Sequence, residues 1–149
     1  MVHSWFELSE ITARQVAVLD QLPRETRLFV FDFTPASRAE EKAWRSLGHV
    51  PDYAVIRRHV IPQSFYMMPH LTRVYYRELP ERVDTTSSML EEQGIAGERL
   101  LEYLAERLNK FPWAWVCHAN SEQQDFLAKR GRVPGQAAPC SLYELHPAP

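Results

Sequence analysis

The sequence predicts a mixed α/β (α+β) domain with helices around a mixed, mostly antiparallel central sheet, and three observations indicate this class. Short apolar runs at 28–33 and 113–117 are rich in aromatic and β-branched residues, as buried strands are. The stretch 100–108 has one apolar face, as an amphipathic helix has. A length of 149 residues with 45% hydrophobic content suits one ordinary core, so we expect a single domain over 1–149.

The first part of the chain alternates expected strands and helices. Residues 5–8 are expected as a short edge strand, and Ser9 caps a helix that ends at Pro23. The strand 28–33 follows, and its weak alternation indicates that both of its faces are covered. Residues 37–47 place apolar side chains on one side and charges on the other, which predicts a helix.

Two long strands are expected next, at 53–61 and 71–79, as an antiparallel pair. The aromatic and methionine cluster at 65–68 lies between them, and core filling is its more common role. The segment 80–92 is polar and contains a Thr-Thr-Ser-Ser run, so we expect a surface loop there.

The second half predicts a helix, a strand, a helix and a strand. The amphipathic helix 100–108 comes first, before the strand 113–117. Asn120 then opens a helix as its N-cap, with Gln123 completing a capping box, and Gly131 closes this helix. A last strand is expected at about 140–145.

Composition excludes several classes of function. A net charge of −2 gives no overall attraction to nucleic acid or to an anionic membrane, and no signal peptide or long apolar run is present, so we expect a cytoplasmic protein. Two cysteines form neither a disulfide framework nor a zinc cluster, so we expect reduced thiols, with Cys117 in the core. The six histidines are dispersed, and no metal site is expected.

Two glycines three residues apart lead directly into the helix 100–108. Gly94 and Gly97 can adopt positive φ, and the first turn of a helix has N–H groups without partners at the positive end of the dipole. Such a turn predicts an anion site, with a phosphate or pyrophosphate as the natural ligand. The alternative is that the glycines only make a tight connection. We expect the turn and Asn120 to lie together, at the carboxyl ends of the strands.

The second half of the chain resembles the GCN5-related N-acetyltransferase (GNAT) family. The segment 93–97, followed by two leucines, is similar to the glycine-rich turn that holds acyl-CoA in that family. The later family pattern runs in register with 120–132, where the spacing of Asn120, Phe126 and Gly131 is kept. Leu127 stands where many relatives have a tyrosine that protonates the leaving thiolate.

The resemblance implies an acyl-CoA-dependent N-acyltransferase, in which an amine attacks the thioester of acetyl-CoA directly. It places the cofactor contacts on Gln93, Gly94, Ile95, Ala96, Gly97 and Asn120. It also places the backbone near Tyr76 beside the pantetheine arm. Glu78 is the candidate base that removes a proton from the amine, while a solvated strand residue beside Arg77 is the more common role for such a glutamate.

The replacement of the tyrosine by Leu127 supports a second hypothesis. A side chain with a proton donor has become one with none, so the chain could instead be a catalytically silent GNAT-like protein that acts by binding a partner protein. In the enzyme hypothesis the partners are acyl-CoA and an amine acceptor that the sequence does not specify. Oligomeric state is left open, although the resemblance points to dimers through sheet edges.

Overall fold

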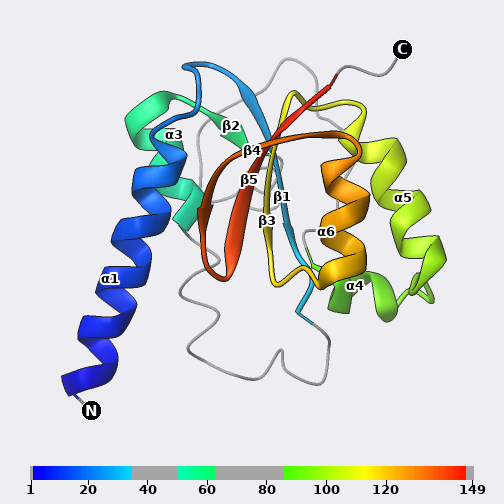
Figure 1. The fold of residues 1–149 in the computed structure, drawn as a ribbon, viewed down its shortest axis with the longest axis horizontal. Helices are drawn as coiled ribbons and strands as arrows, with labels where there is room; N and C mark the ends of the chain where they lie inside the picture. Colours follow the sequence, from blue (N-terminus) through cyan, green and yellow to red (C-terminus); the bar gives the residue numbers. More distant parts are fainter. Residues whose placement is uncertain (1, 35–49, 63–85, 147–149) are drawn as a thin grey trace, which may run out of the picture.

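A computed structural model describes residues 2–34, 50–62 and 86–146, and these residues form a five-stranded sheet in the order β2-β1-β3-β5-β4 (Figure 1). The expected helix 37–47, the cluster 65–68 and the strand 71–79 lie outside the described residues. The strands are β1 (Arg27–Asp32), β2 (Ile61–Pro62), β3 (Trp113–Cys117), β4 (Gly131–Ala137) and β5 (Cys140–Leu145). The helices are α1 (Val2–Leu19), α3 (Val50–Arg58), α4 (Ser87–Glu91), α5 (Glu98–Leu108) and α6 (Ser121–Ala128).

The sheet is mixed. β1 runs parallel to both β2 and β3, whereas β5 runs antiparallel to β3 and to β4. Phe29 lies opposite Ala114 in the parallel ladder, and Trp115 lies opposite Leu142 in the antiparallel one. The predicted mixed α/β class, with a helix-flanked sheet, is therefore confirmed, while the GNAT-like detail stays a prediction.

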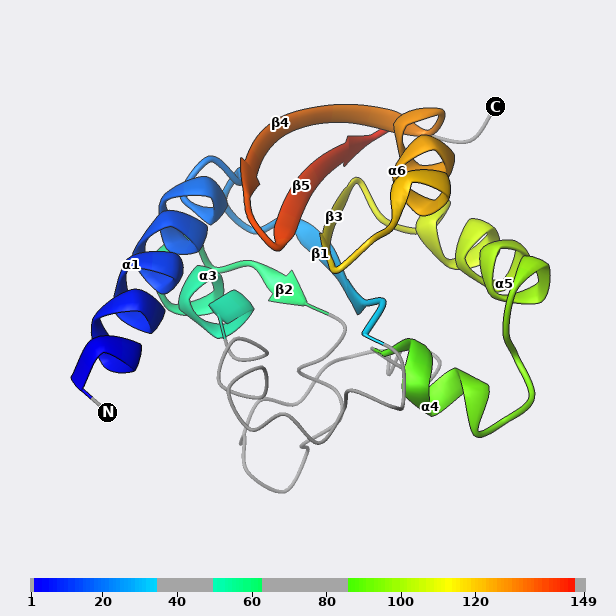
Figure 2. The ribbon, with the colours of Figure 1, turned by 60° about the horizontal axis from the view of Figure 1, so that its bottom comes forward.

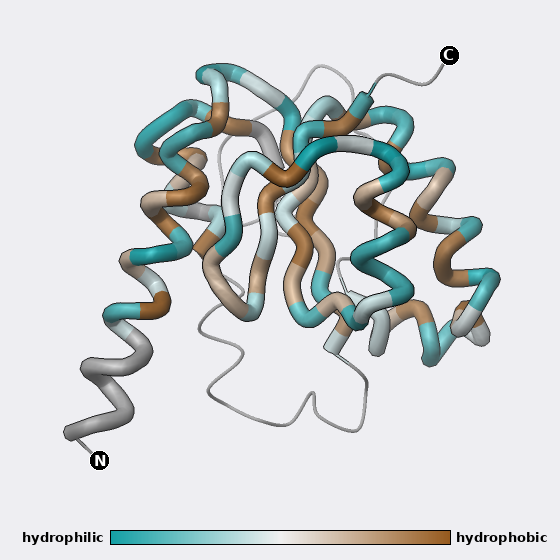
Figure 3. Tube along the Cα trace, viewed as in Figure 1, coloured by the Kyte–Doolittle hydropathy of each residue, from teal (hydrophilic) through white to brown (hydrophobic). Residues whose placement is uncertain are grey.

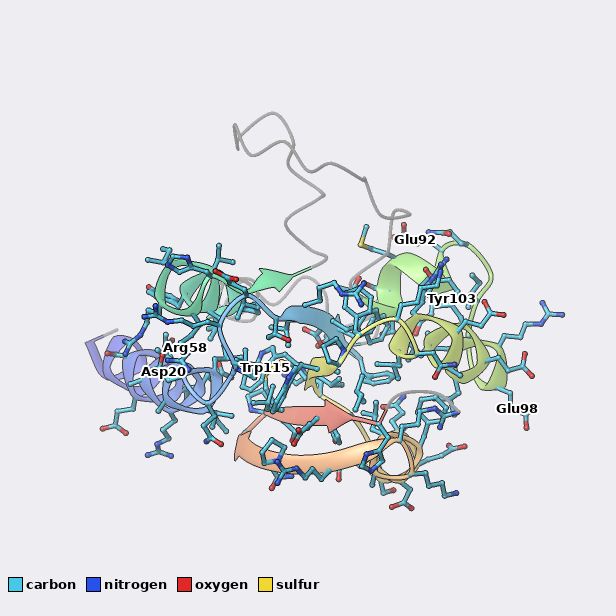
Figure 4. All side chains as sticks on the ribbon, turned by 90° about the horizontal axis from the view of Figure 1, so that it is seen from above. Asp20, Arg58, Glu92, Glu98, Tyr103 and Trp115 are labelled. Atoms are coloured by element: carbon cyan, nitrogen blue, oxygen red, sulfur yellow. A yellow bond between two sulfur atoms is a disulfide. The ribbon has the colours of Figure 1, made fainter. Side chains whose placement is uncertain are left out.

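Helices cover both faces of the sheet (Figure 2). Alternate residues of β1 explain this, because Leu28 packs in one core cluster with α1 and α3, whereas Phe29 and Phe31 pack in another with α4, α5 and α6. Trp115 belongs to the first cluster and lies at the centre of the molecule (Figure 4). The apolar residues accordingly gather on the central strands (Figure 3). A strand that is buried on both faces reads as a continuous apolar run, as 28–33 does.

Six expected elements are confirmed: the strands β1, β3 and β5, and the helices α1, α5 and α6, although Ser9 lies inside α1 and is not its N-cap. In α5 the side chains of Leu100, Leu104 and Leu108 are buried, as the apolar stripe predicts. β3 is the central strand of the sheet. The capping box of α6 is also present.

The edge strand expected at 5–8 is wrong, because these residues continue α1. Aromatic residues favour strands only where a neighbouring strand is available for pairing. The helix ends at Leu19, four residues before Pro23. In the described residues no helix is both long and apolar enough to cross a bilayer.

The strand expected at 53–61 is also wrong, since residues 53–58 belong to the helix α3. Val50 and Ala54, four residues apart, are buried, while Ile56 is exposed, which is a helical period. The β-branched residues misled the prediction. Side chains fix α3 to the end of α1: Arg57 pairs with Asp20 at 2.7 Å, and Arg58 Nε donates to the carbonyl of Leu22 at 2.8 Å (Figure 4).

Part of the expected surface loop 80–92 is a short helix, α4. The hydroxyl of Thr86 caps it by accepting a hydrogen bond from the N–H of Met89 at 3.3 Å. Ser87 and Leu90 are buried, so this segment packs against the sheet and does not run over the surface. The prediction missed the Thr-Ser run as a capping signal.

The sequence reading missed β4 altogether. Gly131 does not close α6, because it is the first residue of β4, and Lys129 is the C-cap. A Cβ on Gly131 would lie 2.2 Å from the carbonyl oxygen of Glu144, so only glycine allows this close strand approach. Pro134 lies where the register shifts between Arg132 and Gly135, as a proline in an edge strand does.

Candidate functional site

A cavity of about 550 Å³ lies at the carboxyl ends of β1 and β3, the edge of the sheet where α4 lies and α6 begins (Figure 1). Ligands of α/β proteins commonly bind at this edge, because helices start there and strands do not block it. The residues that line it are Phe33, Ser87, Glu91, Gly97, Glu98, Leu100, Leu101, His118, Asn120, Glu122 and Gln123.

Two helices begin at the cavity wall. Gly97 is the N-cap of α5, with φ 58° and ψ −130°, a conformation that few residues other than glycine adopt. Asn120 is the N-cap of α6, and its Oδ1 accepts a hydrogen bond from Gln123 N–H at 2.9 Å. Since the cap uses this oxygen, the amide NH₂ of Asn120 is the group that would donate to a ligand. Gly97 and Asn120 therefore lie on one cavity, as expected from the strand order.

Gly94 caps the C-terminal end of α4, a role that the sequence did not predict. Its N–H donates to Glu91, and the N–H of Ile95 donates to Leu90, each at 2.9 Å. With φ 78° at Gly94, these two bonds form a Schellman motif that ends α4. The Gln93 side chain also donates back to the carbonyl of Met89.

Fewer N–H groups of this turn are therefore available to an anion than the sequence predicted. The N–H groups of Gly94 and Ile95 already have carbonyl partners, so they are not open to a phosphate. In contrast, the N–H groups of Ala96, Gly97 and Glu98 donate to no backbone carbonyl among the described residues. A phosphate contact stays a prediction for this second group, and Gln93, Gly94 and Ile95 serve as the cap of α4.

An Asp-His pair joins the ends of β1 and β3. His118 Nδ1 lies 2.8 Å from Asp32 Oδ1, and Thr34 donates to the same oxygen from its N–H at 2.8 Å and its hydroxyl at 2.7 Å. Burial raises the pKa of Asp32, but the hydrogen bonds from His118 and Thr34 and the charge of His118 outweigh it, so this pKa lies below 3.8. The carboxylate therefore stays ionised and orients the imidazole.

The backbone at His118 is in an unusual conformation. Its φ is 56°, in the left-handed region that is uncommon for residues other than glycine, although asparagine, aspartate and histidine adopt it more often than the rest. Strained residues of this kind cluster at functional sites, where the surrounding structure holds them in place. Here the N–H of His118 donates to the carbonyl of Pro139 at 2.9 Å.

The expected reduced thiols are wrong in this structure. Cys117 and Cys140 form a disulfide with 4.0 Å between the two Cα atoms. They lie directly opposite each other in the antiparallel β3–β5 ladder. Two cysteines 23 residues apart did not suggest a bond, because only the register of the two strands brings them together. Cys117 is thus not a free core thiol.

The short helix α4 is attached to the same strand end. Thr86 forms an isolated parallel bridge with Asp32, and the Ser87 hydroxyl donates to the Thr34 carbonyl at 3.0 Å. The Ser87 side chain is almost fully buried. These contacts place α4 beside the Asp-His pair and so fix one wall of the cavity.

The charge of the described wall is mainly negative. Glu91, Glu98 and Glu122 line the cavity, and no lysine or arginine of the described residues does. Glu98 and Glu122 lie in the first turns of α5 and α6, where a carboxylate is also favoured by the helix dipole. The wall therefore favours a ligand with a positively charged group, and leaves the backbone N–H groups as the donors for an anionic group.

Of the remaining predicted residues, the structure describes Leu127, which does not line the cavity. Leu127, to which the resemblance gives the position of the tyrosine, is a residue of α6 whose side chain is buried in the core. Glu78 and Tyr76 lie outside the described residues. Within 2–34, 50–62 and 86–146, no group of three or more His, Cys, Asp or Glu side chains could hold a metal ion.

The sequence reading missed Asp32 and His118. A signal was present, because each follows an apolar run as the first polar side chain at its end. Comparison with known proteins found no matching family model, no matching curated protein and no matching solved structure.

Proposed function

We propose that the cavity is the active site of an acyl-CoA-dependent N-acyltransferase, which transfers an acyl group, acetyl in the simplest case, to an amine of a small molecule or protein. One observation carries this proposal: Gly97 and Asn120, which begin two separate helices, line one cavity of about 550 Å³. Two helix N-termini offer N–H groups and two positive dipole ends to the phosphates of CoA.

The carboxylates on the wall suit the acceptor. Glu91, Glu98 and Glu122 would attract an ammonium group, which must lose a proton before its nitrogen can attack the thioester. A carboxylate or His118 takes this proton, directly or through water. The C–N bond then forms, the C–S bond breaks, and the CoA thiolate leaves. Since Leu127 is buried and has no donor, water or a protonated group on the wall returns the proton to the thiolate.

Calorimetric titration with acetyl-CoA tests the cofactor part of the proposal. We expect saturable binding, and much weaker binding of acetyl-pantetheine, which lacks the phosphates. Gly97→Glu should abolish acetyl-CoA binding, because it adds bulk and a negative charge at the start of α5. Gly97→Ala is the matched control: it has the same unfavourable φ, no charge, and open space around its Cβ. No binding at millimolar acetyl-CoA would remove the enzyme proposal.

The second candidate is a GNAT-like protein without turnover that binds another protein. The observation that favours it is on α3, where Ile56 is 76% exposed and Tyr53 is 50% exposed, three residues apart on one face. Affinity capture from the native host, with Ile56→Asp as the control, would test it. Recovery of the same partner by both proteins, or a monomer without partners, would count against this candidate.

A further inference from the structure

The Cys117–Cys140 disulfide lies next to the residue that joins the cavity to the sheet. Cys117 immediately precedes His118, and Cys140 immediately follows Pro139, which accepts the hydrogen bond of the His118 N–H at 2.9 Å. Two adjacent links thus tie the end of β3 to the start of β5. Together they hold His118 at φ 56°, where its imidazole reaches Asp32.

Gln15 of α1 provides a second, independent observation. Its side chain is fully buried, and its Nε2 lies 3.3 Å from Cys140 Sγ, where it donates to the sulfur. Its Oε1 is buried and has no hydrogen-bond partner among the described residues. A disulfide sulfur can only accept a hydrogen bond, whereas a thiol can also donate one. A protonated Cys140 would therefore offer a donor to the Gln15 amide, which the disulfide sulfur cannot do.

We propose that Cys117–Cys140 is a reversible redox site that controls the conformation of His118, and through it the cavity. The reductant is a dithiol, either a small molecule or a protein. Its thiolate attacks Sγ of Cys117, the less buried of the two residues, and Cys140 leaves as a thiolate beside the Gln15 amide. The second thiol of the reductant then displaces Cys117. The protein gains two electrons and two protons, and the reductant becomes a disulfide.

Reduction removes one of the two links that hold His118 in its strained conformation. The backbone can then relax toward negative φ, which turns the imidazole away from Asp32 and changes the cavity wall that His118 lines. The oxidised protein keeps the Asp-His pair assembled. This inference does not depend on the identity of the ligand.

A titration of the full chain with reduced and oxidised dithiothreitol tests the proposal. Free thiols are counted by maleimide labelling and mass spectrometry, while NMR follows the amide and imidazole signals of His118 in the same samples. We expect two thiols to appear together, and the His118 signals to move in step with them, at unchanged far-UV circular dichroism. The variant with both Cys117→Ser and Cys140→Ser should show the reduced-state signals and ignore the reductant.

Three results would overturn the proposal. Thiols that react before any reductant is added would show that the bond does not form. Constant His118 signals through complete reduction would separate the bond from the cavity. Loss of the far-UV circular dichroism signal on reduction would show that the bond is needed to keep the protein folded and is not a switch.

A pair of glutamine variants tests the place of the amide. Gln15→Met should slow reduction roughly tenfold, because the leaving Cys140 thiolate loses one hydrogen bond from a buried donor. Gln21→Met, two residues after the end of the same helix and exposed, should leave the rate unchanged. Equal rates in the two variants would contradict the role of Gln15.

Discussion

His118 Nδ1 lies 2.8 Å from Asp32 Oδ1, and this contact connects the carboxyl ends of two neighbouring parallel strands, β1 and β3. The two residues are 86 positions apart in the sequence. Thr34 adds two hydrogen bonds to the same carboxylate oxygen, so Asp32 Oδ1 has three hydrogen-bond contacts in all. The cavity is built beside this pair.

The Asp-His pair predicts a pH dependence of stability. The pKa of Asp32 is below its ordinary value of 3.8, so the folded protein favours the ionised carboxylate. This stabilisation is present above about pH 4 and is lost as the pH falls through the lowered pKa. Asp32→Asn should lower the free energy of unfolding by roughly 1–3 kcal/mol at pH 7. The gap between the two proteins should narrow at pH 3, as measured by urea denaturation.

A partly exposed ion pair provides the control for this prediction. Asp20→Asn removes the contact with Arg57, whose side chain is 56% exposed, and should cost less than about 1 kcal/mol at pH 7. A gap for Asp32→Asn that stays constant from pH 7 to pH 3 would show that its carboxylate is not preferentially stabilised in the folded state.

Two glycines predict opposite sizes of effect on stability. Gly131→Ala should destabilise the protein by roughly 3 kcal/mol or more, because the new Cβ would meet a backbone carbonyl at 2.2 Å. Gly94→Ala has open space around its Cβ and a φ of 78°, so it should cost only about 1 kcal/mol. Equilibrium unfolding of both variants checks this order. A reversed order would mean that β4 does not pair closely with β5.

The capping box of α6 predicts how stability and ligand binding separate. Asn120→Ala should cost about 1 kcal/mol of stability, because it removes the acceptor for Gln123 N–H. Asn120→Asp keeps an acceptor and so should retain most of the stability, but it adds a negative charge to the cavity and should weaken acetyl-CoA binding. Thermal unfolding and calorimetry on both variants measure the two effects. Normal binding by Asn120→Asp would place the phosphates away from α6.

The disulfide predicts a loss of stability when it is removed. Cys117 and Cys140 are 23 residues apart, and closing a loop of that length is worth roughly 3 kcal/mol by the chain-entropy argument. The variant with serine at both positions should be less stable by about this amount under oxidising conditions. Adding dithiothreitol should destabilise the original protein and leave the variant unaffected. Equal stability without reductant would contradict the bond.

The predictable part of the fold is the part in which local pattern and tertiary packing agree. β3 and α5 carry apolar patterns that match their burial, and the capping box of α6 requires only residues three apart. The prediction for the segment of α3 was wrong because its β-branched residues favour a strand, whereas packing against α1 selects a helix. β4 was not predicted because Pro134 and Gly135 are poor strand formers, and only pairing with β5 makes the segment a strand.

The candidate site was only partly predictable for a related reason. The local sequence around Gly97 and Asn120 indicates that each begins a helix, and the strand order places both at one edge of the sheet. Asp32 and His118 have no local pattern, because their contact depends on β1 being the parallel neighbour of β3. The disulfide likewise depends on the register of β3 against β5. Long-range pairing of strands was the missing information in both cases.

The most direct measurement of the central proposal is an NMR titration of the ¹⁵N-labelled protein with acetyl-CoA. The account predicts saturable shifts of the amide signals of Gly97, Glu98 and Asn120, which line the cavity, and no shift at Gly135, which packs against α1. Unchanged cavity signals at millimolar acetyl-CoA, or shifts confined to the α1 side of the sheet, would contradict it.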